Sequence, residues 1–99
     1  MLFRSVKEVL PADQLLTRAR ELAHMIATER SPTSTAMARQ MIYRNSAFSH
    51  PEEAHKVESL AMFYASIHDG KEGVASFTEK RKPNFTSKPS QMPDFYPWW

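Results

Sequence analysis

The sequence contains no cysteine, which removes disulfide bridges, thiolate metal ligands and thiol nucleophiles from the candidate chemistries. A chain without disulfides is suited to a reducing compartment, so we expect a cytoplasmic location. No apolar run approaches the roughly 20 residues that a membrane-spanning helix needs, and no membrane partner is expected. The first residues also lack the apolar region of a secretory signal peptide.

Glycine and net charge are also low. The only glycines are Gly70 and Gly73, and the abundant helix-forming residues favour helix over sheet. The net charge is only +2, whereas nucleic-acid-binding proteins concentrate positive charge in a patch, so we expect no nucleic-acid partner. A single tight basic cluster covers residues 80–82. We interpret it as a helix end, where cations interact favourably with the helix dipole, with a local anion site as the alternative.

Three amphipathic helices are predicted. The first covers residues 11–29, where Pro11 suits the opening turn and apolar residues recur at helical spacing. The second begins at Ser31, which caps it, and continues to Arg44. The third begins at Ser49, because Ser49 and Glu52 have the spacing of a capping box. The expected core-facing residues are Leu15, Leu16, Ala19, Leu22, Ala23 and Ile26, then Met37, Met41 and Ile42 with Ala38 beside them, then Val57, Leu60, Ala61, Tyr64 and Ile67.

The third helix carries apolar residues around most of its circumference. Met62 and Phe63 lie away from its core-facing stripe. A helix of this kind is covered on more than one side, and so short a chain has little of its own to cover it. We therefore expect a homo-oligomer, or contact with a domain outside these residues.

A short fourth helix and an irregular tail complete the prediction. The helix is expected to open at the capping signal of Asp69 and Glu72 and to continue to about Lys80, before Pro83. The predicted fold is all-α, with three main amphipathic helices, a short fourth helix and a long irregular aromatic C-terminal tail. In domain terms, residues 1–10 are a short extended lead-in, residues 11–82 a helical domain and residues 83–99 the Pro/aromatic tail.

Candidate catalytic and metal sites are few. No pair among the four histidines has the spacing of a helical metal site, and no nucleophile elbow, P-loop or dinucleotide fingerprint occurs. The acidic residues near the start of the third helix suit the helix dipole and need no acid–base role. The sequence therefore predicts no catalytic residue, no metal site and no bound cofactor.

Two segments carry a resemblance to a known family. Residues 72–85 (EGVASFTEKRKPNF) resemble a C-terminal signature of the enoyl-CoA hydratase/isomerase, or crotonase, superfamily. Residues 9–16 (VLPADQLL) resemble the link between the core of that family and its C-terminal helices, and Ser31-Pro32 also matches. The resemblance covers nearly the whole chain and implies the helical C-terminal region, without the N-terminal core that carries the oxyanion hole and the acid–base carboxylates.

The resemblance also implies a role for two residues. In the family signature, an aromatic ring and a lysine approach the adenosine end of CoA bound to an adjacent subunit, and the matching residues are Phe77 and Lys80. An aromatic face suits adenine and an ammonium suits phosphate. The implied function is the oligomerisation and CoA-flanking portion of a protein that hydrates α,β-unsaturated acyl-CoA, inactive on its own. Acyl-CoA and the missing N-terminal core are the implied partners.

Two alternatives remain open at this level. The first is a free-standing helical interaction module without enzymatic activity, which would bind a partner through the third helix and the aromatic tail. The second is an anion- or nucleic-acid-binding module that uses residues 80–82 with Phe77 and Phe85, against which the low net charge argues. If neither residue contacts a ligand, Phe77 is expected to be a core residue and Lys80 a solvated charge.

Overall fold

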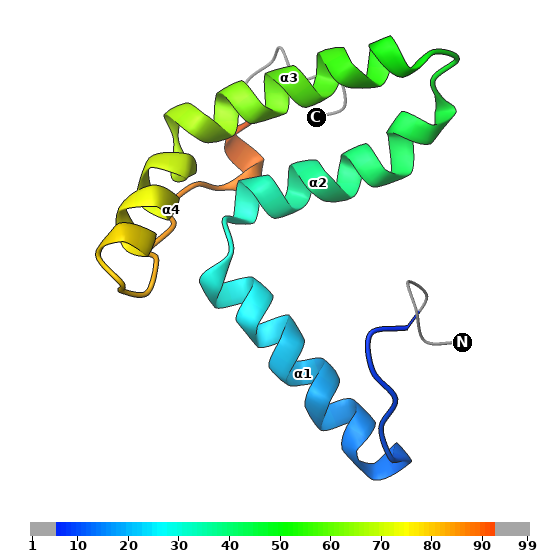
Figure 1. Cartoon of the computed structure of the whole chain (residues 1–99), viewed down its shortest axis with the longest axis vertical. Coiled ribbons are helices and arrows are strands. Elements are labelled where there is room, and N and C mark those ends of the chain that lie inside the picture. Colours follow the sequence, from blue (N-terminus) through cyan, green and yellow to red (C-terminus); the bar gives the residue numbers. More distant parts are fainter. Residues whose placement is uncertain (1–5, 93–99) are drawn as a thin grey trace.

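The four predicted helices are present in the computed structural model, which describes residues 6–92 (Figure 1). No strand occurs within this described range, so the all-α prediction is confirmed. Short 3₁₀ turns follow α2 and interrupt the segment after α4, which was predicted to have no helix of its own. The bounds are α1 (Ala12–Glu29), α2 (Pro32–Arg44), α3 (Pro51–Ile67), α4 (Asp69–Thr78), η1 (Asn45–Ala47) and η2 (Pro89–Gln91). The aromatic end of the predicted tail, residues 93–99, and residues 1–5 lie outside the described residues.

Of the three predicted capping residues, one is confirmed and two are wrong, although α4 begins at Asp69 as predicted. The Ser31 hydroxyl accepts the Ser34 N–H at 3.1 Å and caps α2, as predicted. The cap of α3 is His50 instead of Ser49, because extended backbone at His50 brings its Nδ1 to the Glu52 N–H at 3.2 Å. Asp69 does not cap α4, since it lies inside the helix and points its carboxylate at other segments.

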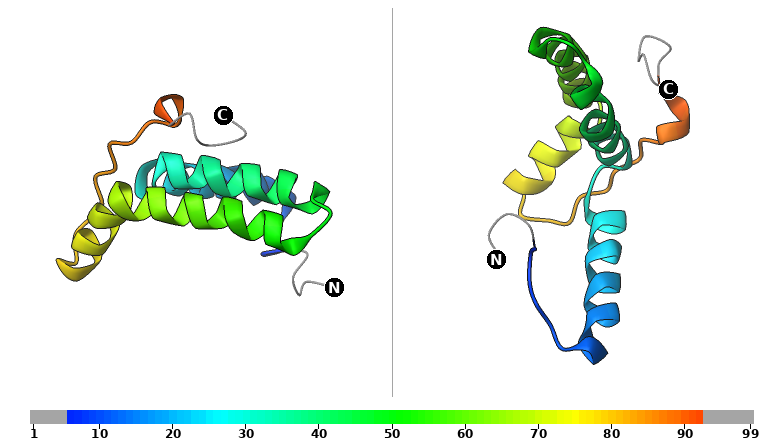
Figure 2. Two further views of the ribbon diagram at one scale, coloured as in Figure 1. Left: turned by 90° about the horizontal axis from the view of Figure 1, so that it is seen from above. Right: turned by 90° about the vertical axis from the view of Figure 1, so that its right-hand side faces the viewer.

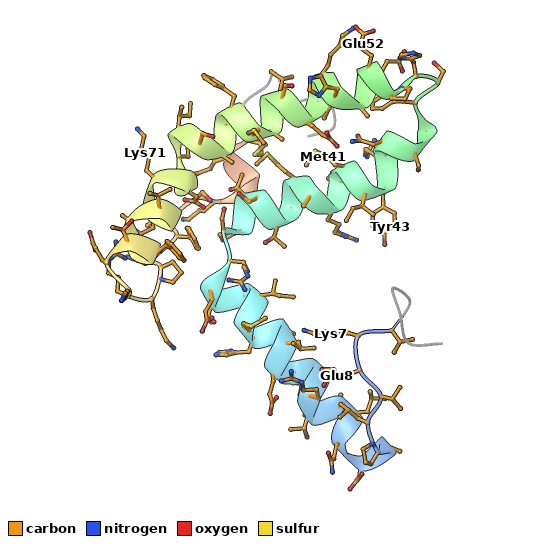
Figure 3. All side chains as sticks on the ribbon, viewed as in Figure 1. Lys7, Glu8, Met41, Tyr43, Glu52 and Lys71 are labelled. Atoms are coloured by element: carbon orange, nitrogen blue, oxygen red, sulfur yellow. The ribbon has the colours of Figure 1, made fainter. Side chains whose placement is uncertain are left out.

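A small core lies between α2 and α3. The two helices run antiparallel and side by side, and Figure 3 shows Met41 on the α3-facing side of α2 and Tyr43 on the opposite side. The side chains of Met37, Ala61 and Val57 are exposed by only 2%, 4% and 6%. Partly buried hydrophobic residues pack around them, and η2 lies against α2 from one side of the pair (Figure 2). They are Met41, Phe48, Tyr64, Ala65 and Met92.

Helix α1 extends away from this pair, so its apolar stripe is not part of the core (Figures 1 and 2). None of its residues is buried, and Leu15 and Leu16 are each 60% exposed. The expectation that the stripes of all three main helices pack together is therefore wrong for the first helix. The radius of gyration is 16.3 Å, against roughly 13 Å for a compact chain of this length. Helical spacing fixes which face is apolar, but not what covers that face.

Parts of α2 and α3 are uncovered as well. Leu60, Ile67 and Ile42 were expected to face the core and are exposed. Met62 and Phe63 project from α3 with 73% and 62% of their surface exposed, in agreement with their predicted place outside the stripe. Along residues 6–92, no helix combines the length and the apolar character required to cross a membrane.

Replacing Met37 with alanine should destabilise the fold by about 3 kcal/mol, because a buried side chain is removed and a cavity is left. Urea unfolding followed by far-UV circular dichroism measures the change. The matched control is Val74→Ala, at an exposed position on α4, which should change the free energy of unfolding by less than about 0.5 kcal/mol. Equal effects of the two substitutions would show that the core does not lie between α2 and α3.

Candidate functional site

The C-terminal end of α4 forms a turn that carries both sequence-predicted site residues. The Glu79 N–H donates to the Ala75 carbonyl at 2.9 Å, the Lys80 N–H to Phe77 at 3.3 Å and the Arg81 N–H to Ser76 at 3.0 Å. The last two bonds are those of a Schellman motif, which ends a helix with one residue in the left-handed conformation. That residue is Lys80, with φ of 54°. We call residues 76–81 the Schellman turn.

Glycine usually occupies this position, because the left-handed conformation costs a residue with a Cβ roughly 1–2 kcal/mol. Lys80 is the only non-glycine residue among residues 6–92 with a positive φ. The turn also corrects one expectation. The fourth helix was expected to continue to about Lys80, but α4 ends at Thr78 and Lys80 lies beyond it. Lys80 is joined to Phe77, in the last turn of α4, through the backbone hydrogen bond of the turn.

Phe77 is not a core residue, since 85% of its side chain is exposed. It lines an open depression of about 350 Å³ between the end of α1, α4 and the segment that follows α4. Phe85 and Arg30 contribute to the same depression, whereas Lys80 and Lys82 do not line it. The structure thus brings Phe77 and Phe85 together, and it exposes the aromatic ring that the sequence singled out.

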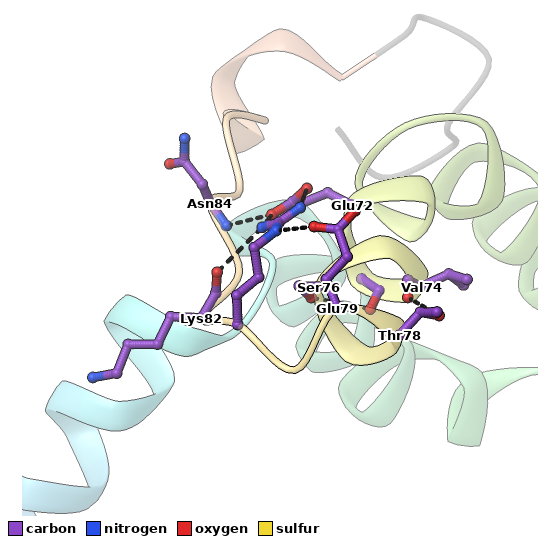
Figure 4. Close-up of polar contacts among 9 residues, drawn as sticks. Glu72, Val74, Ser76, Thr78, Glu79, Lys82 and Asn84 are labelled. Atoms are coloured by element: carbon purple, nitrogen blue, oxygen red, sulfur yellow. Dashed lines mark hydrogen bonds and ion pairs between the residues drawn. The ribbon is translucent and has the colours of Figure 1, made fainter.

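Arg81 is held by two glutamates, Glu72 on the first turn of α4 and Glu79 inside the Schellman turn (Figure 4). Its Nη1 and Nη2 lie 2.5 and 2.8 Å from the two carboxylate oxygens of Glu72, a bidentate pair, and its Nε lies 2.5 Å from Glu79 Oε2. Glu72 Oε1 also accepts the backbone N–H of Asn84 at 2.7 Å. We call Glu72, Glu79 and Arg81 the Arg81 clamp. It fixes the chain after the helix onto the first turn of α4.

Glu72 and Arg81 stay charged over the whole neutral range. The Arg81 guanidinium, followed by the Asn84 N–H, lowers the pKa of Glu72 from 4.5 to about 2. Hydrogen bonds from Arg81 to Glu72, and secondarily to Glu79, raise the pKa of Arg81 above its usual value. Both shifts have the same cause, since each partner's charge is stabilised by direct hydrogen bonds to the other.

The basic cluster at residues 80–82 is therefore largely neutralised. Arg81 is paired with Glu72 and Glu79, and Lys82 Nζ lies 3.8 Å from Glu29 Oε1. Within residues 6–92, no ion pair involves Lys80. The ammonium of Lys80 is thus the one cation of this cluster without an acidic partner in the described part of the chain.

A buried carboxylate places α4 relative to the rest of the chain. Asp69 is 8% exposed, and its Oδ2 accepts the Ser31 hydroxyl at 2.6 Å and also the Ser87 hydroxyl. These three residues come from the α1–α2 link, from the start of α4 and from the segment before η2. Sequence reasoning took Asp69 for a helix cap, and no local pattern points to partners 38 and 18 residues away.

The family model described as enoyl-CoA hydratase/isomerase matches residues 5–88. This range includes all four helices, the Arg81 clamp and the segment up to Lys88. The chain belongs to the enoyl-CoA hydratase/isomerase family. The resemblance to this family is therefore confirmed, and in this chain residues 72–85 contain the Schellman turn and the clamp.

Known members of the family show how much of their length this chain represents. An enoyl-CoA hydratase of Alternaria alternata is 46% identical over 76 residues, 75% of this chain and 25% of that protein. A probable enoyl-CoA hydratase of Mycobacterium tuberculosis is 35% identical over 85 residues, 84% of this chain and 32% of that protein. One of Bacillus subtilis is 36% identical over 73 residues, 73% of this chain and 28% of that protein. The chain spans about a quarter to a third of these relatives.

The contribution of Glu72 to stability should depend on pH. Its pKa is lowered in the folded state, so its contribution is fully present above about pH 4.5 and disappears as the pH falls through about 2. The difference in urea midpoint between the wild type and Glu72→Gln should therefore shrink over that interval. Glu58→Gln, at an exposed position on α3, is the control and should show no such difference at any pH. A Glu72 difference that does not change between pH 6 and pH 2 would contradict the charged pair.

Proposed function

We propose that this chain is the oligomerisation and CoA-flanking portion of an enoyl-CoA hydratase/isomerase protein and that these residues catalyse no reaction by themselves. The reaction of the whole protein would be the addition of water across the double bond of an α,β-unsaturated acyl-CoA, as in fatty acid metabolism. The acid–base carboxylates and the oxyanion hole would come from an N-terminal core outside these 99 residues. We further propose a cytoplasmic location.

The exposed ring of Phe77 is the observation that carries the CoA-flanking role. A phenylalanine with 85% of its side chain in solvent has no structural function in the described chain, and a planar adenine would cover it favourably. Lys80, on the same turn, supplies an ammonium without an acidic partner in the described chain, and such a group attracts phosphate. The proposed ligand contact is therefore with the adenosine end of CoA and leaves the acyl end to other parts of the protein.

The uncovered apolar surfaces support the oligomerisation role. Helix α1 has no buried residue, and Met62 and Phe63 project from α3 into solvent. Exposed apolar area of this extent is typical of surfaces that other protein covers. Second copies of the chain and the N-terminal core are the proposed occupants. The same surfaces would serve the alternative function, a helical interaction module without enzymatic activity, which has a different partner and no need of Phe77 or Lys80.

The pure 99-residue chain should not hydrate crotonyl-CoA. The loss of the conjugated thioester absorbance measures the reaction, and the expected rate equals that of buffer alone. CoA should nevertheless bind weakly, and the amide NMR signals of Phe77 and Lys80 should shift during the titration. Turnover that persists in the purest preparations would contradict the assignment of the chemistry to another region. Absence of any CoA-dependent shift would favour the interaction module.

The particle mass in solution should exceed the 11.4 kDa of one chain at micromolar concentration. Light scattering coupled to size-exclusion chromatography measures the mass. Replacing Met62 and Phe63 together by serine should lower it, because the exposed apolar surface of α3 is removed. The control is Val74→Ser, an equally exposed apolar position on α4, which should leave the mass unchanged. A monomer at every concentration would refute the oligomerisation role.

A further inference from the structure

We infer that Arg81 is a positioning residue, which holds the Schellman turn so that Phe77 and Lys80 are presented to an adenine nucleotide, and that Arg81 does not itself bind the anion. This inference rests on the proposed contact of Phe77 and Lys80 with the adenosine end of CoA. It assigns a role to the Arg81 clamp, whose charges would otherwise work against the binding of an anion.

The first step is the backbone of Lys80. A lysine with φ of 54° is in a conformation that a residue with a Cβ rarely adopts without support from its surroundings. A glycine would form the same turn without this cost, but it would bring no ammonium. The turn therefore combines a charged side chain with an unfavourable backbone, and something nearby must stabilise that combination.

The second step is the geometry of the clamp. The Arg81 backbone N–H closes the Schellman turn on Ser76, while its side chain reaches back to Glu72 on the first turn of α4. Glu72 also holds the Asn84 N–H, so the chain is fixed on both sides of the turn (Figure 4). The flanking residues of Lys80 are thereby constrained, which limits residue 80 to conformations that connect them.

The third step is the charge and the donor count. The guanidinium has five N–H donors, and it donates to Glu72 twice, to Glu79 and to the Lys82 carbonyl. Few of its N–H donors therefore remain to bind a phosphate group. One guanidinium and two carboxylates give the clamp a net charge of −1, which opposes an anion close by. This arrangement is unsuited to binding phosphate, but it is suited to holding the backbone of the turn in place.

Opposite signs distinguish the two roles in one measurement. If Arg81 bound the anion directly, Glu72→Ala would free its guanidinium, remove a negative charge and tighten CoA binding. If the clamp positions the turn, Glu72→Ala weakens CoA binding, and Arg81→Lys does the same because an ammonium cannot form the bidentate pair. The weakening expected from losing the left-handed turn is roughly five- to thirtyfold in the dissociation constant.

The experiment is a titration of the 99-residue chain with CoA, in which calorimetry and the amide NMR signals measure binding. Arg18→Lys is the matched control, because Arg18 on α1 is likewise held by two glutamates at 2.9 Å each, Glu21 on the same helix and Glu8 in the segment before it. It should leave the dissociation constant unchanged. The three-bond coupling between the amide and α protons of residue 80 reports its φ without ligand, and it should lose its left-handed value in Arg81→Lys.

A rescue separates positioning from general loss of stability. Chemical synthesis can place D-lysine at position 80, which favours positive φ and keeps the ammonium. In the Arg81→Lys background this change should restore the wild-type dissociation constant.

Each outcome has a defined meaning. Tighter binding by Glu72→Ala, no rescue by D-lysine, or an unchanged φ in Arg81→Lys would overturn the positioning role. If the wild type does not bind CoA, or Phe77→Ala and Lys80→Ala bind it as tightly as the wild type, the proposed function fails instead. The coupling measurement then still decides whether the clamp holds the turn.

Discussion

The buried carboxylate of Asp69 is the interaction on which the arrangement of this chain most depends. It accepts hydrogen bonds from the hydroxyl groups of Ser31 and Ser87. It thereby joins the α1–α2 link, the start of α4 and the segment before η2. An ionisable group with 8% of its side chain exposed is tolerated only where hydrogen bonds replace the lost water. With that condition met, the start of α4 is fixed beside the α1–α2 link, and the chain after α4 returns along the same side. The Schellman turn occupies the other end of α4, and the Arg81 clamp ties that turn back to Glu72 on the first turn of the helix.

The small core buries only a few of the apolar side chains in residues 6–92. Three side chains are fully buried as apolar groups among residues 6–92, and all lie between α2 and α3. All apolar residues of α1, and many of those on α3, are in contact with solvent. The matched segment makes up 25% and 32% of two relatives, and exposed apolar area of this extent is typical of surfaces that other protein covers. Phe77 belongs to the same pattern, but it stands on a turn held by ion pairs.

The turn after α4 illustrates how a functional position can conflict with local preference. Glycine would suit residue 80 better than lysine, and two carboxylates beside a proposed phosphate contact reduce the attraction for an anion. Both conflicts are resolved if the function of the turn is to present Lys80 and Phe77 to the ligand. The two glutamates then serve to hold Arg81. Sites where local rules are broken are where function is expected. Among residues 6–92, the pairing also leaves Lys80 as the one cation of the basic cluster without an acidic partner.

The sequence by itself determined the helices, because i→i−4 hydrogen bonding, apolar spacing and caps such as Ser31 are local properties. It also identified the family through residues 72–85, and it singled out Phe77 and Lys80. Only the tertiary structure decided the direction of α1, the exposure of its stripe, the burial of Asp69 and the pairing of Arg81 with Glu72. These features depend on contacts between distant residues, and a helical pattern specifies an apolar face without specifying its partner. The left-handed turn at Lys80 is likewise set by its clamped neighbours, since lysine has no preference for it.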